Sequence, residues 1–136
     1  MRCLSIRQPW ADLIVRGIKD VENRNWRCHH RGPLLIHASM NVEKITQRHL
    51  EAKGYTFGPF SPGCIVGAVR IVDCLPFERK KSDWHEPDCW GFYLVDAVRF
   101  PEPIPFTGKL GLFDVPLNAV SYQLYATGFE VKGVAV

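Results

Sequence analysis

The sequence lacks any long apolar run. Its 136 residues contain no stretch that approaches the roughly 20 apolar residues needed to cross a bilayer. The first segment, MRCLSIRQPWADLIV, has no continuous apolar stretch and no small-residue cleavage site, so it does not predict a signal peptide. We therefore expect a cytoplasmic protein without a membrane partner.

The cysteines follow no pattern. The five cysteines are scattered, and no two of them form a C-x-x-C pair. An odd number without regular spacing argues against a secreted disulfide framework and favours reduced thiols. The sequence also lacks internal repeats, low-complexity tracts and a Gly/Ser linker. We therefore expect residues 1–136 to form a single domain, for which this length is usual.

Several well-known catalytic motifs are also missing. The sequence contains no P-loop, dinucleotide-binding fingerprint or nucleophile elbow. A zinc site made of Cys28, His30, His85 and Cys89 is a weak alternative, because the spacings C-x-H and H-x-x-x-C fit no established zinc motif. We therefore predict neither a metal nor a cofactor.

Positive charge, in contrast, is concentrated at one end of the chain. The net charge is +3, from 17 basic and 14 acidic residues. Residues 1–31 hold seven basic and three acidic residues, or +4, so the other 105 residues sum to −1. Such a local concentration is typical of proteins that bind phosphates. On charge alone, a solvated surface rich in arginine explains it equally well.

The apolar periodicity predicts more strands than helices. Strands are expected over 3–6, 34–38, 64–75, 91–100 and 110–115, an extended segment over 20–26, and helices near 9–17 and 41–53. In the long strand over 64–75, Gly67 is expected to supply a bend. The second helix should begin after Asn41 and bury Val42, Ile45, His49 and Ala52. This order predicts an α+β fold, a small curled barrel with two flanking helices.

Four segments resemble the ASCH domain family, whose signature is G-x-K-x-x-E-x-R. They are residues 4–11 (LSIRQPWA), 17–24 (GIKDVENR), 32–39 (GPLLIHAS) and 108–113 (GKLGLF), in the family's order. The similarity covers residues 3–116 and leaves 117–136 as a C-terminal extension. It implies a PUA-like β-barrel that binds RNA or a nucleotide in a basic cleft between the first helix and the barrel.

The resemblance implies a site centred on Lys19, Glu22 and Arg24. An arginine fork suits phosphate, a carboxylate can accept a hydrogen bond from a base, and Lys19 would place an ammonium at the cleft mouth. The alternative for Glu22 and Arg24 is a structural ion pair. Trp84, in a polar loop, is the best candidate for an exposed stacking surface. Further candidates for ligand binding are Arg7, Gln8, His37, Ser39 and Lys109.

The resemblance leaves open whether the chain is an enzyme. Some family members are reported to hydrolyse N4-acetylcytidine nucleosides, and others to cut RNA. The alternative function is therefore a metal-independent hydrolase acting on RNA or on such a modified nucleoside, with Lys19 and Glu22 as catalytic residues. The acetylcytidine hydrolases carry a threonine where Glu22 stands, which argues against that activity. With Asp20 and Glu22 nearby, we expect Lys19 to stay charged and to act as a phosphate anchor.

Overall fold

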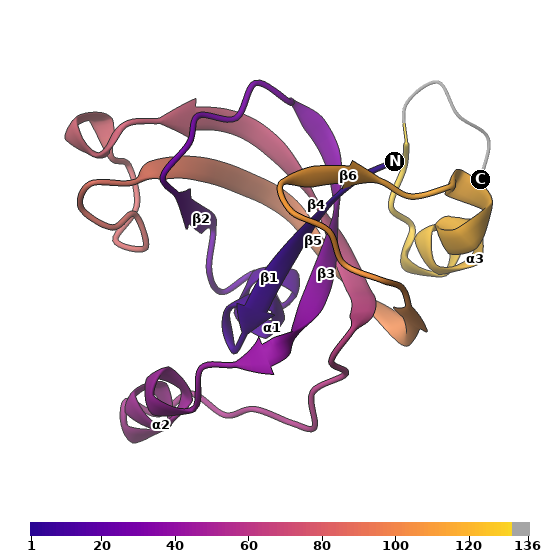
Figure 1. Cartoon of the computed structure of the whole chain (residues 1–136), viewed down its shortest axis with the longest axis horizontal. Helices are drawn as coiled ribbons and strands as arrows, with labels where there is room; N and C mark the ends of the chain where they lie inside the picture. The colour runs from indigo at the N-terminus through magenta and orange to yellow at the C-terminus, as the bar shows by residue number, and fades with distance from the viewer. Residues whose placement is uncertain (132–136) are drawn as a thin grey trace.

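The computed structural model describes residues 1–131, and within them six strands form one mixed sheet (Figure 1). The strand order is β2-β5-β4-β3-β1-β6. Only β1 and β3 run parallel, and the other neighbouring pairs are antiparallel. The strands are β1 (Arg2–Gln8), β2 (Val21–Arg24), β3 (Gly32–Val42), β4 (Cys64–Leu75), β5 (Trp90–Pro105) and β6 (Leu112–Asp114).

The sheet curls strongly but does not close into a barrel. Its two edges are β2 and β6, which have four and three residues. Such short strands offer few backbone groups for a further ladder. The α+β class is confirmed, whereas the structure does not show the closed barrel that we expected.

Strand β4 has the bounds that the sequence predicts, and its pairing with β5 is irregular next to Gly67. Its register with β5 shifts between Ile65 and Gly67 and at two later points. A Cβ atom on Gly67 would lie 2.2 Å from the carbonyl oxygen of Val98 and 2.7 Å from Cγ1 of Val15. Glycine is therefore required here, because both the neighbouring strand and the first helix approach its backbone closely.

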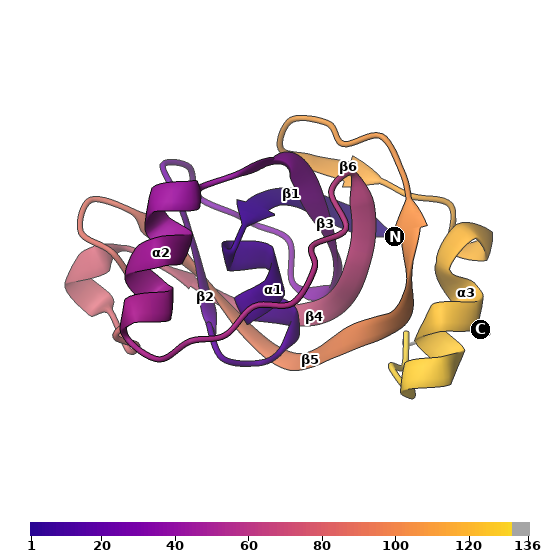
Figure 2. The same ribbon diagram turned by 90° about the horizontal axis from the view of Figure 1, so that it is seen from below.

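Helix α1 (Trp10–Val15) lies inside the curl of the sheet (Figure 2). Ala11, Ile14 and Val15 pack there against apolar residues of β1, β3 and β4. Arg16 pairs with Asp12 at 2.8 Å across one turn, as the spacing predicts. Gly17, with φ of +74°, ends the helix in the left-handed region.

Helix α2 (Lys44–Ala52) begins later than predicted and buries a different face. Strand β3 continues to Val42 and takes Asn41 into the sheet, so Asn41 does not cap the helix. The predicted inner stripe is wrong, because Ile45 is 67 % exposed and His49 and Ala52 are also exposed. Leu50 is the buried residue of this helix. The helix lies at one end of the molecule, where little of the sheet is available to cover it (Figure 1).

Helix α3 (Leu117–Thr127) was not predicted. It packs outside the curl, where Val120 and Leu124 join a second apolar cluster with Cys3, Leu35 and Phe100 of the sheet (Figure 2). The helix occupies part of the predicted C-terminal extension, of which residues 132–136 lie outside the described residues. A short 3-10 turn (Phe77–Arg79) follows β4. Within residues 1–131, every helix is too short or too polar to cross a membrane.

Candidate functional site

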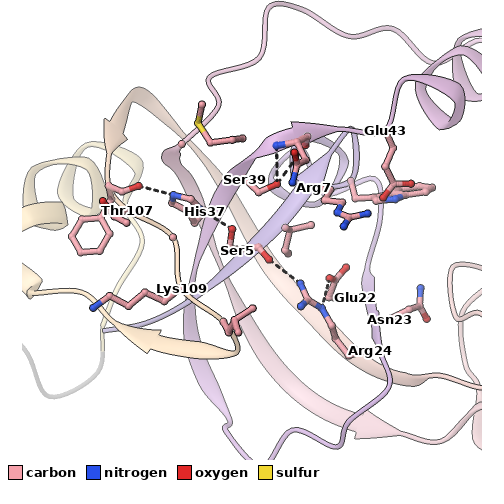
Figure 3. A pocket seen from close by; sticks show the side chains of 18 of the residues that line it. Ser5, Arg7, Glu22, Asn23, Arg24, His37, Ser39, Glu43, Thr107 and Lys109 are labelled. Carbon is pink, nitrogen blue, oxygen red and sulfur yellow. Dashed lines mark hydrogen bonds and ion pairs between the residues drawn. The ribbon is translucent and has the colours of Figure 1, made fainter.

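A cleft of about 1310 Å³ lies among β1, β2, β3, the start of α1 and the loop after β5 (Figure 3). All the predicted site residues except Gln8 line it, although they come from distant parts of the sequence. Its charged lining residues are Arg7, Lys19, Glu22, Arg24, Glu43, Glu86 and Lys109. Four cations and three carboxylates give a lining charge of +1, so the cleft is less basic than the sequence alone predicts.

Glu22 stands at the centre of an ion-pair cluster in the cleft wall. Its Oε2 accepts a hydrogen bond from Nε of Arg24 at 2.9 Å, and its Oε1 lies 3.4 Å from Nζ of Lys19. Glu22 is 7 % exposed and Lys19 4 % exposed. Because a buried charge is costly unless it is paired, the three side chains fix one another in place.

Lys19 lies in the wall of the cleft rather than at its mouth. The turn that follows α1 brings the backbone N–H groups of Ile18 and Lys19 back to the carbonyl oxygen of Leu13. The Lys19 ammonium then donates to the carbonyl oxygen of Val21 and lies 5.4 Å from the ring centroid of Trp10. The Lys19 ammonium therefore contacts neighbouring groups of the protein and is almost completely shielded from solvent.

Arg24 presents a partly used guanidinium to the cleft (Figure 3). Nε–H is bonded to Glu22, and Nη2 donates to the backbone oxygen of Ser5 at 2.9 Å. Of the five N–H groups of an arginine, three have no partner within residues 1–131. The guanidinium is therefore held by two hydrogen bonds and keeps its remaining N–H groups free, a geometry that suits a phosphate or carboxylate ligand.

Ser5 and His37 form a hydrogen-bonded pair on the same cleft surface. They are direct partners in the parallel ladder of β1 and β3. Nδ1 of His37 lies 2.9 Å from Oγ of Ser5, and Nε2 lies 2.7 Å from the carbonyl oxygen of Phe106. Of these two residues, the sequence predicted His37 as a site residue but not Ser5. The sequence did offer an indication, because Ser5 and Arg7 are two residues apart in a strand and therefore lie on the same face.

The remaining predicted site residues divide into two groups. Arg7, Ser39 and Lys109 line the cleft. Arg7 and Lys109 are exposed, and no ion pair involves either of them in the described part of the chain. Gln8 is buried and faces away, because its Oε1 accepts the backbone N–H of Asp12 at 2.8 Å and so holds the start of α1. The structure therefore does not bring Gln8 into the cleft.

Most of the positive charge in residues 1–31 is internally neutralised. Arg2 pairs with Asp114 at 3.2 Å, and Arg31 with Asp73 at 3.8 Å, in addition to the pairs of Arg16, Lys19 and Arg24. Arg7 and Arg27 are the members of this group without an acidic partner among the described residues. Arg27 lies 5.5 Å from the ring centroid of Trp90. In the cleft, Arg7 adds unpaired charge, and Lys19 and Arg24 share the one carboxylate of Glu22, which leaves that cluster with a net charge of +1.

Trp84 is not the exposed stacking surface that its polar loop suggested. It is half-buried and packs edge-on against Trp10 and Tyr55, with ring centroids 6.3 Å and 6.2 Å apart. Trp10, in contrast, lines the cleft itself. Trp10 and Phe106 are therefore the aromatic residues that line the cleft, and Trp84 packs against the edge of Trp10.

The zinc alternative is wrong. Nδ1 of His85 is bonded to the hydroxyl of Tyr93 and Nε2 to the carbonyl oxygen of Cys89, both at 2.9 Å. Nε2 of His30 is bonded to the carbonyl oxygen of Pro33 at 2.8 Å. Across residues 1–131, no group of three or more metal-binding side chains comes together.

Comparison with known proteins gives consistent matches. A model of the ASCH domain matches residues 4–104. Human Activating signal cointegrator 1 is 40 % identical over 91 residues, and the mouse protein of the same name is 43 % identical over 95 residues. These matches cover 60 % and 63 % of this chain, which spans only 16 % of the length of either relative. The crystal structure of ASCH from Zymomonas mobilis has a TM-score of 0.58 at 15 % identity, covering 92 % of this chain and 93 % of that chain, a likeness of fold alone.

Proposed function

Because the chain belongs to the ASCH domain family, we propose that its cleft binds RNA or a nucleotide derived from RNA. The family is associated with RNA binding. The ligand would enter between α1 and the curled sheet, where Arg24, Arg7 and Lys109 line one continuous surface.

The observation that carries this proposal is that three cationic side chains of the cleft still have hydrogen-bond donors free for a ligand. Arg24 is oriented by Glu22 and by the backbone of Ser5, with three N–H groups still free among the described residues. Arg7 and Lys109 are exposed and form no ion pair within residues 1–131. A fixed guanidinium in a cleft that two exposed cations also line is a suitable receptor for phosphates, which arginine binds through parallel hydrogen bonds.

The base of a nucleotide would find both an apolar face and a hydrogen-bond acceptor in the same cleft. The indole of Trp10 is half-buried and lines the cleft, so an unpaired base can stack against it. Glu43 also lines the cleft and accepts a bond from Thr46 on one carboxylate oxygen at 3.0 Å. The other oxygen can accept from an exocyclic amine of a base.

Lys19 and Glu22 act in this proposal as positioning residues for Arg24. The ammonium of Lys19 donates to the Val21 carbonyl and to the Glu22 carboxylate, so two of its three donors are committed to the protein. A lysine nucleophile must present a neutral, accessible amine. These contacts favour a charged anchor over the reactive lysine of the alternative hydrolase.

A salt titration tests the proposal. Binding of a fluorescent single-stranded RNA would be measured at several salt concentrations for the wild type, Arg7→Gln and Lys109→Gln. Each change should weaken binding to all sequences and lower the slope of log affinity against log salt by roughly 0.7 for each phosphate that the variant no longer neutralises. These two residues are chosen because replacing Lys19 or Arg24 would also break the buried ion-pair cluster.

The matched control is Arg79→Gln, which removes the same charge from an exposed position outside the cleft. It should leave both affinity and slope close to those of the wild type. If Arg79→Gln weakens binding as much as Arg7→Gln, attraction is general rather than local. If the double variant of Arg7 and Lys109 binds like the wild type, the cleft is not the binding site.

A further inference from the structure

We propose that Ser5 and His37 are a nucleophile and its general base, and that the cleft hydrolyses carboxylic esters of phosphate-bearing alcohols. The choice of an anionic ester rests on the proposed binding of phosphate in the same cleft. The nucleophile–base pair itself rests on separate observations at β1, β3 and the loop after β5.

The positions of the protons in this pair follow from its partners. The carbonyl oxygen of Phe106 can only accept, so the hydrogen bond of 2.7 Å requires that Nε2 of His37 carries the proton. In the neutral imidazole Nδ1 is then an acceptor, and the bond of 2.9 Å to Ser5 must be donated by the serine hydroxyl. The hydroxyl proton of Ser5 therefore already points at a base, as nucleophilic catalysis by serine requires.

The third member of this arrangement is the Phe106 carbonyl. It fixes the ring orientation and the tautomer of His37, and it accepts the Nε2–H when the ring becomes positively charged. An orienting group behind the base is the geometric signature of an activated hydroxyl. Here that group is a neutral main-chain oxygen supplied by the cleft loop.

The local fold holds the pair at the cleft surface. His37 is 2 % exposed, whereas Ser5 is half-buried and lines the cleft. The register of β3 with β4 shifts between Ile36 and His37, an irregularity that re-aims side chains and is common beside active sites. The base is thus shielded, and its serine partner faces the space where a substrate would bind (Figure 3).

Gly108 lets the cleft loop lie directly on the pair. A Cβ atom at this position would be 2.8 Å from Cε1 of His37 and 3.1 Å from Oγ of Ser5. Any side chain would therefore displace the loop that orients the base.

Arg24 is placed to stabilise the negative charge that forms during attack. Its Nη2 donates to the backbone oxygen of Ser5 at 2.9 Å, which puts the guanidinium beside the nucleophilic residue. An ester that is attacked at its acyl carbon develops an oxyanion, and a fixed positive charge in a partly dry site stabilises it. Arg7 and Lys109 remain available for the phosphate of the alcohol portion.

The reaction balances without any further reagent than water. Oγ of Ser5 bonds to the acyl carbon while its proton moves to Nδ1 of His37. The carbon–oxygen bond to the alcohol then breaks, and the same proton passes to the departing alkoxide. Water, deprotonated by Nδ1, attacks the acyl-serine, and the proton returns to Oγ. The products are a carboxylic acid and a phosphate-bearing alcohol.

The first test uses p-nitrophenyl acetate as the probe of the nucleophile. Release of p-nitrophenolate would be followed for the wild type, Ser5→Ala, His37→Gln and Ser121→Ala, and acetylated peptides would be located by mass spectrometry. We expect acetyl on Ser5 or turnover that requires Ser5, and a loss of about 100-fold or more in His37→Gln. Glutamine can still donate to Phe106 and hold the loop, but it cannot accept the hydroxyl proton.

Ser121→Ala is the matched control, because Ser121 is a half-buried serine of α3 outside the cleft. It should react like the wild type, and circular dichroism should show all variants folded. Turnover that persists in Ser5→Ala, or the absence of both turnover and Ser5 acetylation in the wild type, would overturn the proposal. Equal rates in His37→Gln and the wild type would also overturn it.

A second probe tests the substrate class. Hydrolysis of an O-acetylated nucleoside 5′-monophosphate would be compared with that of the same ester without phosphate. We expect the phosphate to raise kcat/KM by about tenfold, the value of one charge-assisted hydrogen bond, and Arg7→Gln to remove that advantage. Wild-type RNA binding would be measured in parallel. RNA binding without Ser5 chemistry overturns only this inference, and Ser5 chemistry without RNA binding overturns only the proposed function.

Discussion

Glu22 is the residue on which the cleft wall depends. One carboxylate, 7 % exposed, satisfies both Lys19 and Arg24. A buried pair of this kind contributes little net stability when compared with apolar residues of similar size, but its partial removal leaves an uncompensated charge. Glu22 therefore determines both the stability of this wall and the direction in which Arg24 points.

Glu22→Ala should lower the free energy of unfolding by about 3–5 kcal/mol, because Lys19 would remain buried without its counter-charge. Urea denaturation of the two proteins measures the difference. The matched control is Glu86→Ala, which removes an exposed carboxylate of the same cleft that forms no ion pair among the described residues. It should change stability by less than about 0.5 kcal/mol. Similar values for both variants would show that the Glu22 cluster is not a buried network.

Cys3 gives the protein a specific response to alkaline pH. Burial raises the pKa of its thiol from 9.0 to about 12. Between these two values the unfolded chain loses a proton that the folded chain retains, so stability falls as pH rises. The contribution is about 1.4 kcal/mol per pH unit.

Cys3→Ala should therefore show a shallower decline of stability above pH 9 than the wild type. The measurement is urea denaturation at several alkaline pH values. The slopes of unfolding free energy against pH are compared between the two proteins, because the constant cost of the cavity left by Cys3→Ala does not affect a slope. Parallel slopes would mean that the Cys3 thiol titrates similarly in the folded and unfolded chains.

For single residues, the sequence indicated which side chains lie close together better than it indicated which of them are buried. Glu22 and Arg24 share one face of an extended segment, and the ion pair that the sequence analysis kept as an alternative is present in the structure. It did not reveal that Lys19 is buried, because that depends on how the turn after α1 folds back onto the sheet. Ser5 was missed because a lone serine carries little signal until its cross-strand partner is known.

Among the elements, the contact between α1 and β4 sets the shape of the curl. The helix lies against β4 at Gly67, where a Cβ atom would meet both the Val98 carbonyl and the side chain of Val15. Helix α1 can sit inside the sheet only because β4 offers no side chain there. The position of α1 in turn places Trp10 beside the cleft.

Gly67→Ala should destabilise the fold by at least about 1–3 kcal/mol, the usual cost of overpacking, because the backbone of β5 cannot move away without breaking the ladder. Gly58→Ala is the control, since an added Cβ there has no heavy atom within 4 Å. Thermal unfolding of both variants would measure the effect. If Gly67→Ala melts like Gly58→Ala, the close approach of β5 and α1 does not constrain the sheet.

Elements with strong periodicity were predicted well, and those stabilised by packing were not. Strand β4 matched its predicted bounds, whereas the face of α2 was wrong because Ile45 has helical spacing but no neighbour to cover it. Helix α3 was missed because its buried apolar residues, Val120 and Leu124, stand among other apolar or aromatic residues that are exposed, such as Tyr122 and Tyr125. Which face of this helix is buried becomes clear only when the helix is seen packed against the outer surface of the sheet.

For the whole molecule, the proposed function depends on the curl rather than on any single segment. Arg7, Arg24, His37 and Lys109 come from four separate regions of the sequence, and the order β2-β5-β4-β3-β1-β6 brings them around one cleft. Motif order predicted the family, and the apolar periodicity predicted the α+β class. Neither could show that the sheet stays open, because closure depends on the lengths and directions of the edge strands β2 and β6.

The central claim is that RNA or a nucleotide binds in this cleft, and mapping the binding site tests it most directly. Backbone amide chemical shifts would be recorded during titration with a short single-stranded RNA. We predict the largest changes at Arg7, at Arg24 and in the loop over 106–111, with α3 unaffected. Changes confined to the exposed tyrosines of α3 or to residues 27–31, with the cleft unperturbed at saturation, would contradict it.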